Sequence, residues 1–127
     1  MKTIRFVNLK FQDSNFKKKI TNRFNKILKH GQFILGPEVQ EMETKIAKFC
    51  KREFCVGTAS GTDAIYLALR ALEIGNGDEV ITVSHTANAT VSAIELTGAK
   101  TVFCDIEKDF YSIDVQKITS LITPNTK

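Results

Sequence analysis

Apolar side chains in the first fifty residues recur every three or four positions, which is the spacing of an amphipathic α-helix. Asp13 or Ser14 can cap the start of a first helix, and Gly31 can close its end. A second helix is predicted to begin at Gly36-Pro37, where proline suits the first helical position, and to end near Lys51. In the first helix the apolar positions are Phe16, Ile20, Phe24, Ile27 and Leu28. In the second helix the residues expected to face inward are Val39, Met42, Ile46, Phe49 and Cys50.

From residue 53 onward, short runs of strand-forming residues alternate with apolar stretches of helical length. Strands are predicted over 53–58, 79–83 and 100–104, and helices over 62–74, 86–96 and 114–122. This β-α-β-α-β-α order predicts an α/β fold with parallel strands, right-handed crossovers and helices on the sheet. We expect a helical N-terminal segment, residues 1–52, followed by the first half of an α/β domain, residues 53–127. Because three parallel strands leave two open edges, residues 1–127 are interpreted as a single incomplete domain, the N-terminal part of a longer protein.

Composition excludes several classes of protein. The 127 residues are 43% hydrophobic, which is enough for a folded core, and part of the formal net charge of +4 comes from a basic helix over Lys17–Lys29. That helix is interpreted as a solvated face, so nucleic-acid binding is disfavoured. Three cysteines without a C-x-x-C pair, and two histidines, argue against a disulfide framework or a zinc site. The start MKTIRFVNLKF lacks the long apolar core of a signal peptide, and no apolar run approaches membrane length, so a soluble cytoplasmic protein is expected.

The loop Gly57–Asp63 (GTASGTD) joins the first predicted strand to an apolar helix. Its small residues let a ligand approach the backbone, and the free N–H groups at the helix start favour an anion such as a phosphate. The hydroxyls of Ser60 and Thr62 can add hydrogen bonds. The alternative is structural, in which Ser60 or Thr62 caps the helix and Gly61 permits a tight turn. The loop matches neither G-x-G-x-x-G nor G-K-[ST], so a Rossmann or P-loop nucleotide site is disfavoured.

Two other segments carry candidate chemistry. Ser84–Thr90 (SHTANAT) follows a buried strand and would lie at the same sheet edge as the glycine loop. Its imidazole, His85, suggests a surface that binds a ring, and the alternative is a capping or surface histidine. Gln32–Val39 (QFILGPEV) is an apolar loop between the first two helices, which either packs in the core or lines a site.

Together these segments resemble the DegT/DnrJ/EryC1/StrS family of sugar aminotransferases, which use pyridoxal 5′-phosphate (PLP). The resemblance extends over essentially the whole chain, with its elements in order and at sensible spacing. The elements are RFVNL at 5–9, GQFILGPEV at 31–39, ASGTDA at 59–64, GDEVI at 77–81, SHTANAT at 84–90, GAK at 98–100, VFCD at 102–105 and TPNTK at 123–127.

The resemblance implies the N-terminal part of the large domain of a type I, aspartate aminotransferase-like fold, in a homodimer with active sites at the subunit interface. Members transfer an amino group, usually from glutamate, to a keto group on a nucleotide-linked sugar, in deoxysugar, polysaccharide or O-antigen biosynthesis. The Ser-His-Thr-Ala form is most similar to members that act on dTDP-linked 3-keto-6-deoxyhexoses. The alternative is a non-catalytic relative that binds an effector or a partner subunit.

Carried onto this sequence, the resemblance assigns the PLP phosphate to Gly61, Thr62 and Asp63. Many members have an aromatic residue where this chain has Ala87, so stacking on the pyridine ring would fall to His85.

Phe33 and Gly36 would border the substrate pocket. The resemblance places no catalytic residue within the chain, because the family's Schiff-base lysine and the acidic partner of the pyridine nitrogen would lie beyond Lys127. PLP chemistry needs both groups, so residues 1–127 alone are not expected to catalyse transamination.

Overall fold

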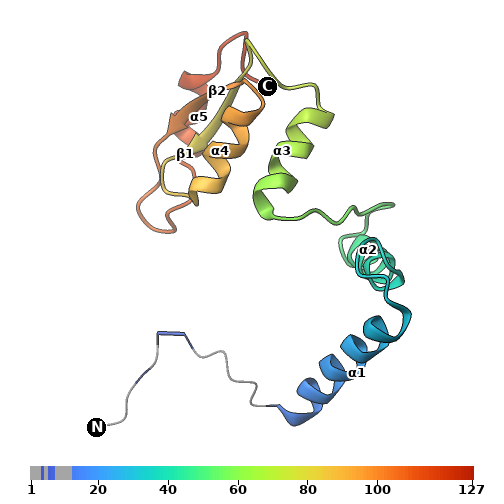
Figure 1. The fold of residues 1–127 in the computed structure, drawn as a ribbon. Helices are drawn as coiled ribbons and strands as arrows, with labels where there is room; N and C mark the ends of the chain where they lie inside the picture. The colour runs from blue at the N-terminus through green and yellow to red at the C-terminus, as the bar shows by residue number, and fades with distance from the viewer. Residues whose placement is uncertain (1–3, 5, 8–12) are drawn as a thin grey trace. The chain divides into compact units, whose positions relative to one another are not determined.

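The computed structural model describes residues 4, 6–7 and 13–127, and most of the family-like segment at 5–9 therefore lies outside the described residues. The elements follow in the order α1, α2, α3, β1, α4, β2 and α5 (Figure 1). The chain divides into two compact units, Met1–Gly57 and Thr58–Lys127, and each is described by itself. The single incomplete domain inferred from the sequence stays a prediction.

Helix α1, Ser14–His30, begins and ends where the sequence predicts. The side chain of Asp13 accepts hydrogen bonds from the backbone N–H groups of Asn15 and Phe16, at 2.7 and 3.2 Å. These bonds satisfy two of the donors that a helix start leaves free. At the other end, Gly31 adopts φ 71° and its N–H donates to the carbonyl of Ile27 at 2.8 Å. Of the two predicted capping residues, Asp13 is therefore the cap.

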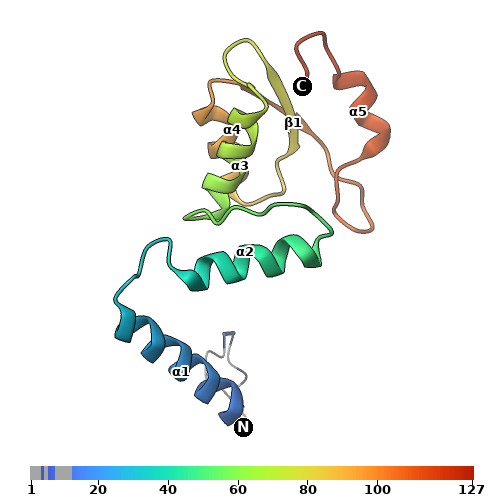
Figure 2. The same cartoon turned by 90° about the vertical axis from the view of Figure 1, so that its right-hand side faces the viewer.

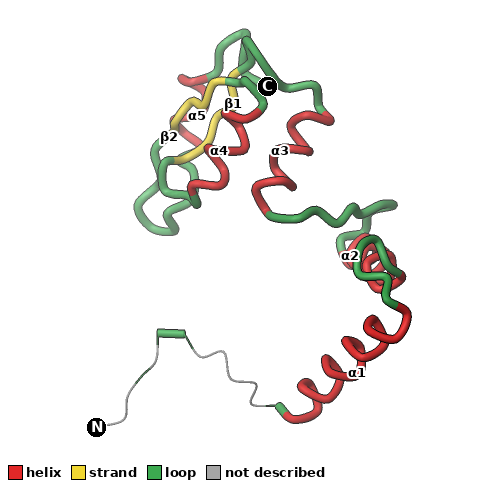
Figure 3. Tube along the Cα trace, viewed as in Figure 1, coloured by secondary structure: helices red, strands yellow, loops and turns green. Residues whose placement is uncertain are grey.

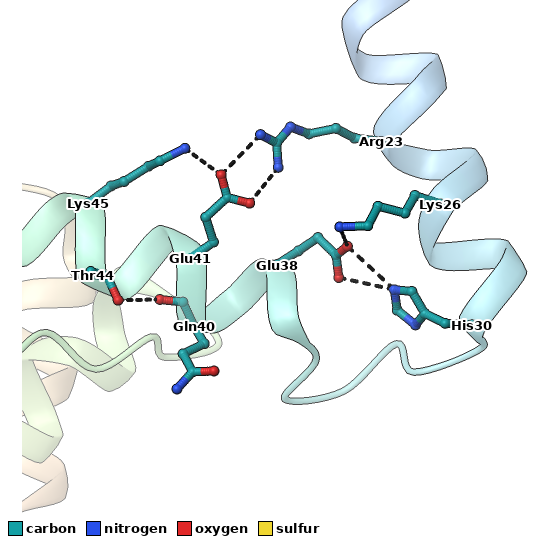
Figure 4. A network of polar contacts seen from close by, with 8 residues as sticks. All are labelled: Arg23, Lys26, His30, Glu38, Gln40, Glu41, Thr44 and Lys45. Carbon is teal, nitrogen blue, oxygen red and sulfur yellow. Dashed lines mark hydrogen bonds and ion pairs between the residues drawn. The ribbon is translucent and has the colours of Figure 1, made fainter.

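Helix α2, Pro37–Phe49, has proline in its first turn, as predicted, and ends two residues before the expected Lys51. Acidic side chains of α2 pair with basic side chains of α1 (Figure 4). Arg23 makes a bidentate pair with Glu41, at 2.7 and 3.0 Å, and Lys45 also contacts that carboxylate. The Arg23 and Lys45 hydrogen bonds lower the pKa of Glu41 to about 2.

A second pair of contacts joins the same two helices. Nε2 of His30 lies 3.2 Å from Oε2 of Glu38, and Nζ of Lys26 lies 3.5 Å from Oε1 (Figure 4). In the structure His30 connects the end of α1 to the start of α2.

Two predictions for this unit are wrong. The side chains of Met42, Ile46 and Phe49 are exposed, and Ala47 is the buried apolar residue of α2. Helical periodicity identifies an apolar face, but it does not supply the surface that covers the face. Residues 53–58 do not form the predicted strand and run as a loop between α2 and α3 (Figure 3). Strand-forming residues become a strand only beside a hydrogen-bonding partner, and the described residues offer none here.

The second unit has helices on both faces of a two-stranded parallel sheet. Strands β1, Glu79–Val83, and β2, Lys100–Cys104, have the predicted bounds and pair with Glu79 opposite Lys100. Helices α3, Gly61–Ala71, and α4, Asn88–Leu96, lie on one side of the sheet, and α5, Val115–Leu121, lies on the other (Figure 2). The helix–strand–helix–strand–helix order and the parallel pairing confirm the predicted α/β class for this part of the chain.

A small apolar core holds α4 against the sheet and against the end of α3. Ile74, Ile94 and Ala99 form its buried centre, with Leu69 and Val80 packed around it. Helix α3 ends at Ala71, three residues earlier than predicted, and the chain then places Ile74 in this core. Within the part of the chain that the structure describes, no helix is both long and apolar enough to cross a membrane.

The segment 123–127 is attached to the edge of β1 through Glu79. The carboxylate of Glu79 accepts a hydrogen bond from the hydroxyl of Thr123 at 2.6 Å and pairs with Nζ of Lys100 at 2.9 Å. Both contacts lower the pKa of Glu79, and the hydrogen bond from Thr123 has the larger effect. The backbone of Glu79 also bonds to Asn125 and Lys127, at 2.8 and 3.0 Å. The TPNTK segment, residues 123–127, therefore lies beside β1 and is hydrogen-bonded to it through Glu79.

Candidate functional site

The start of α3 has the geometry of a capped helix. Ser60 is extended, with φ −156° and ψ 167°, and its Oγ accepts a hydrogen bond from the backbone N–H of Asp63 at 3.1 Å. The same hydroxyl donates to Oδ2 of Asp63 at 2.9 Å. Ser60 therefore caps α3 through its side chain, which is the structural role that the sequence analysis offered as the alternative.

Gly61 and Thr62 differ from Ser60, because several of their polar groups make no hydrogen bond within the described residues. Their backbone N–H groups belong to the first turn of α3 and have no hydrogen-bond acceptor among the described residues, and neither has the hydroxyl of Thr62. A Cβ built on Gly61 would meet no atom within 4 Å, so a ligand can approach this backbone. Two free N–H donors, a free hydroxyl and the positive end of a helix dipole fit a phosphate group.

Asp63 contributes differently from its two neighbours. Its N–H is already engaged by Ser60, and its carboxylate lies in the first turn of the helix. A carboxylate there stabilises the helix start but repels a bound anion. The donors available to a phosphate are therefore those of Gly61 and Thr62, and the assignment of Asp63 stays a prediction.

The segment after β1 lies at the same end of the unit as the start of α3. Figures 1 and 2 show that α3 and α4 both begin at the end where β1 stops. Helix α4 begins at Asn88 rather than at the predicted Thr86, and its capping residue, Ala87, makes no side-chain cap. The turn is held instead by a hydroxyl–hydroxyl bond of 3.0 Å between Thr86 and Thr90. Parallel strands place ligand-binding loops at this edge of an α/β sheet.

His85, the candidate ring-binding residue, contacts an aromatic side chain that the sequence analysis did not single out. Its ring centroid lies 5.9 Å from that of Tyr111, with the two planes tilted by 46°. Tyr111 belongs to the loop after β2, and so it too follows the carboxyl end of a strand. The same argument that selected His85 could have selected Tyr111, since both follow parallel strands.

The predicted substrate-border residues belong to the first unit. Gly36 is buried, and a Cβ added to it would lie 2.6 Å from the carbonyl oxygen of Gln32, so only glycine fits this turn. Phe33 is exposed, as are the neighbouring Ile34 and Leu35. The turn thus presents exposed apolar side chains, and the roles of Phe33 and Gly36 in substrate binding stay predictions.

Comparison with known proteins identifies the family. The model of the DegT/DnrJ/EryC1/StrS aminotransferase family matches residues 14–127. The UDP-2-acetamido-2-deoxy-3-oxo-D-glucuronate aminotransferase of Pseudomonas aeruginosa is 44% identical over 124 residues, which are 98% of this chain and 34% of the relative. The dTDP-3-amino-3,6-dideoxy-alpha-D-galactopyranose transaminase of Aneurinibacillus thermoaerophilus is 40% identical, with the same coverage. A pleiotropic regulatory protein of Geobacillus stearothermophilus is 36% identical over 95% of this chain and 32% of the relative.

Solved structures give the same result. DesV of S. venezuelae, determined in complex with a ketimine intermediate, has a TM-score of 0.86 and 37% identity over 89% of this chain and 30% of that one. NtdA of Bacillus subtilis, with bound cofactor PMP, has a TM-score of 0.86 and 33% identity over 91% of this chain and 26% of that one. These likenesses confirm the predicted fold class.

The fold and these likenesses therefore define an α/β protein of the PLP-dependent aminotransferase type. The chain belongs to the DegT/DnrJ/EryC1/StrS aminotransferase family. It spans about a third of the length of the curated relatives that it matches.

Proposed function

We propose that the whole protein is a PLP-dependent aminotransferase that acts on a nucleotide-linked keto-sugar, and that residues 1–127 hold the cofactor's phosphate. The observation that carries the proposal is the pair of unpartnered N–H groups at Gly61 and Thr62, beside an open backbone and a free hydroxyl. The Schiff-base lysine is proposed to lie beyond Lys127. Family membership and the PMP-bound relative support PLP as the group that occupies this site.

Each residue has a separate task in this proposal. Gly61 and Thr62 donate N–H bonds to the phosphate oxygens, and the Thr62 hydroxyl adds a third, charge-assisted bond. Ser60 and Asp63 hold the first turn of α3 so that these donors are oriented before the ligand arrives. His85 lies against the pyridine ring. The bound PLP would supply the electron sink that stabilises negative charge on the substrate carbon.

The substrate is proposed to be a 3-keto sugar on a nucleoside diphosphate, with glutamate as the amino donor. The names of two of the relatives give an oxo or amino group at position 3 of the sugar, which is a UDP sugar for the Pseudomonas aeruginosa enzyme and a dTDP sugar for the Aneurinibacillus thermoaerophilus enzyme. Of the two, we propose a dTDP-linked 3-keto-6-deoxyhexose, on the basis of the Ser84–Ala87 form. We further propose that the enzyme works as a homodimer in the cytoplasm, in deoxysugar or polysaccharide biosynthesis.

The experiment that tests this proposal uses the whole protein mixed with PLP. Absorbance of the bound cofactor, borohydride reduction and mapping of the modified lysine test cofactor attachment. Conversion of dTDP- and UDP-linked 3-keto sugars, each with glutamate, tests the activity and ranks the two nucleotides. PLP binding without a modified lysine would refute catalysis.

A second candidate function is a non-catalytic regulator with the same fold. The likeness to the pleiotropic regulatory protein supports this candidate. It predicts no amino transfer to any nucleotide sugar, together with specific binding of an effector or a partner subunit.

A further inference from the structure

The loop between β2 and α5, residues 105–114, is organised around one carboxylate. Glu107 accepts hydrogen bonds from the backbone N–H groups of Asp109, Phe110 and Ser112, at 2.7, 2.8 and 3.2 Å, and from the Ser112 hydroxyl at 3.2 Å. The N–H of Glu107 donates back to the carbonyl of Ser112 at 2.9 Å. These hydrogen bonds, of which that from the Asp109 N–H has the largest effect, lower the pKa of Glu107. The carboxylate therefore stays ionised at neutral pH, and both of its oxygens remain hydrogen-bond acceptors.

This arrangement fixes Tyr111 in an unfavourable backbone conformation. Tyr111 has φ 58°, in the left-handed region that a bulky residue rarely adopts. The bonds to Glu107 come from both sides of Tyr111, so they hold the backbone around it. Strain of this kind persists when the surrounding structure over-determines it, and it clusters at functional sites.

In this conformation the ring of Tyr111 contacts the ring of His85. Tyr111 places its ring 5.9 Å from the imidazole of His85, at a tilt of 46°, which is within the range of favourable aromatic pairs. Its neighbour Phe110 is the more exposed of the two aromatic residues and has no ring partner among the described residues. The loop thus presents one of its two aromatic rings to the candidate cofactor-binding histidine.

We propose that Tyr111 is a positioning residue, which limits the orientations of the His85 ring so that its face is ready for the cofactor. Glu107 acts through Tyr111 by holding the loop. The inference rests on the proposed function, because it assigns His85 to the pyridine ring of PLP. It extends that function to a loop to which the sequence analysis assigned no role.

The test compares Tyr111→Leu with Phe110→Leu as the matched control in the same loop, in the whole protein with and without PLP. Tyr111→Phe keeps the ring and serves as the conservative variant. Without PLP, the histidine ring resonances are recorded by NMR and assigned with a His85→Gln variant, and His30 serves as an internal reference. With PLP, the dissociation constant and the visible circular dichroism of the bound cofactor are measured.

We expect Tyr111→Leu to shift the His85 resonance and leave that of His30 in place. We expect it to weaken PLP binding by roughly 2- to 10-fold, the factor that corresponds to one aromatic pair, and to change the circular dichroism of bound PLP. Tyr111→Phe and Phe110→Leu should each leave the His85 resonance, the PLP affinity and the circular dichroism as in the wild type. Glu107→Gln should shift His85 in the same direction, with no added effect on the Tyr111→Leu background.

Each contrary outcome has a distinct meaning. An unmoved His85 resonance in Tyr111→Leu would show that the ring contact does not exist, whatever the protein binds. A shifted resonance with PLP affinity and circular dichroism equal to those of Phe110→Leu would refute the positioning role while the cofactor proposal stands. A wild-type protein that binds no PLP would refute the proposed function, and the role of Tyr111 toward the cofactor with it.

Discussion

Replacing Ser60 and Thr62 in turn separates the two roles that the glycine loop combines, a helix cap and a phosphate cradle. Ser60→Ala removes the acceptor for the N–H of Asp63 and the donor to its carboxylate, which are bonds of 3.1 and 2.9 Å. Loss of such a cap lowers the free energy of unfolding by about 1 kcal/mol, within a range of roughly 0.5–2 kcal/mol. The two free N–H groups that follow remain, so we expect PLP affinity to change little.

Thr62→Val should have the opposite profile. The Thr62 hydroxyl has no hydrogen bond within the described structure, so its loss should change the free energy of unfolding by less than about 0.5 kcal/mol. A hydrogen bond to a charged group contributes roughly 1.5–3 kcal/mol, which corresponds to a PLP dissociation constant about 10- to 150-fold higher. Thr62→Ser keeps the hydroxyl and should bind PLP as the wild type does.

Urea unfolding and PLP titration of the three variants provide the assay. The reasoning is refuted if Thr62→Val binds PLP as tightly as the wild type, or if Ser60→Ala loses affinity without losing stability. The first result would mean that the Thr62 hydroxyl does not bind the phosphate, and the second would mean that Ser60 acts on the ligand rather than on the helix start.

Three further predictions concern contacts within each of the two units. Ile94→Ala should lower the free energy of unfolding by about 2–5 kcal/mol in urea unfolding, because Ile94 is 2% exposed at the centre of the core. Arg23→Gln should raise the pKa of Glu41 from about 2 toward 4.5 in an NMR titration. Because the folded pKa is depressed, the pair's contribution to stability is present above about pH 4.5 and is lost as the pH falls toward 2. Thr123→Val should speed amide exchange at Lys127, which bonds to the carbonyl of Glu79, and unchanged exchange would contradict that anchoring.

The sequence predicted those elements whose ends are set by local chemistry. Asp13 and Gly31 fix both ends of α1 through bonds within a few residues, and both were visible as capping residues. The bounds of β1 and β2 were also predicted correctly, because each is a short apolar run between turn residues.

Predictions failed where a partner distant in the sequence decides the structure. Residues 53–58 have strand composition but no strand beside them in the described structure, and α3 ends early because Ile74 turns into the core. The contact between His85 and Tyr111 depends on how two strand-end loops meet, which no local pattern encodes. Contacts between residues distant in the sequence therefore limited how accurately the fold and the site could be predicted.

The motif GTASGTD did not distinguish a cap from a cradle, and the structure of the helix start explains why both interpretations fit. Capping and anion binding use the same resource, the N–H groups that a helix start leaves free. Ser60 takes the N–H of Asp63 and leaves those of Gly61 and Thr62. The cap therefore does not compete with a phosphate but fixes the turn that presents the remaining donors. The cap and the cradle use different N–H groups of the same turn, which is why we expect the two substitutions to act on different quantities.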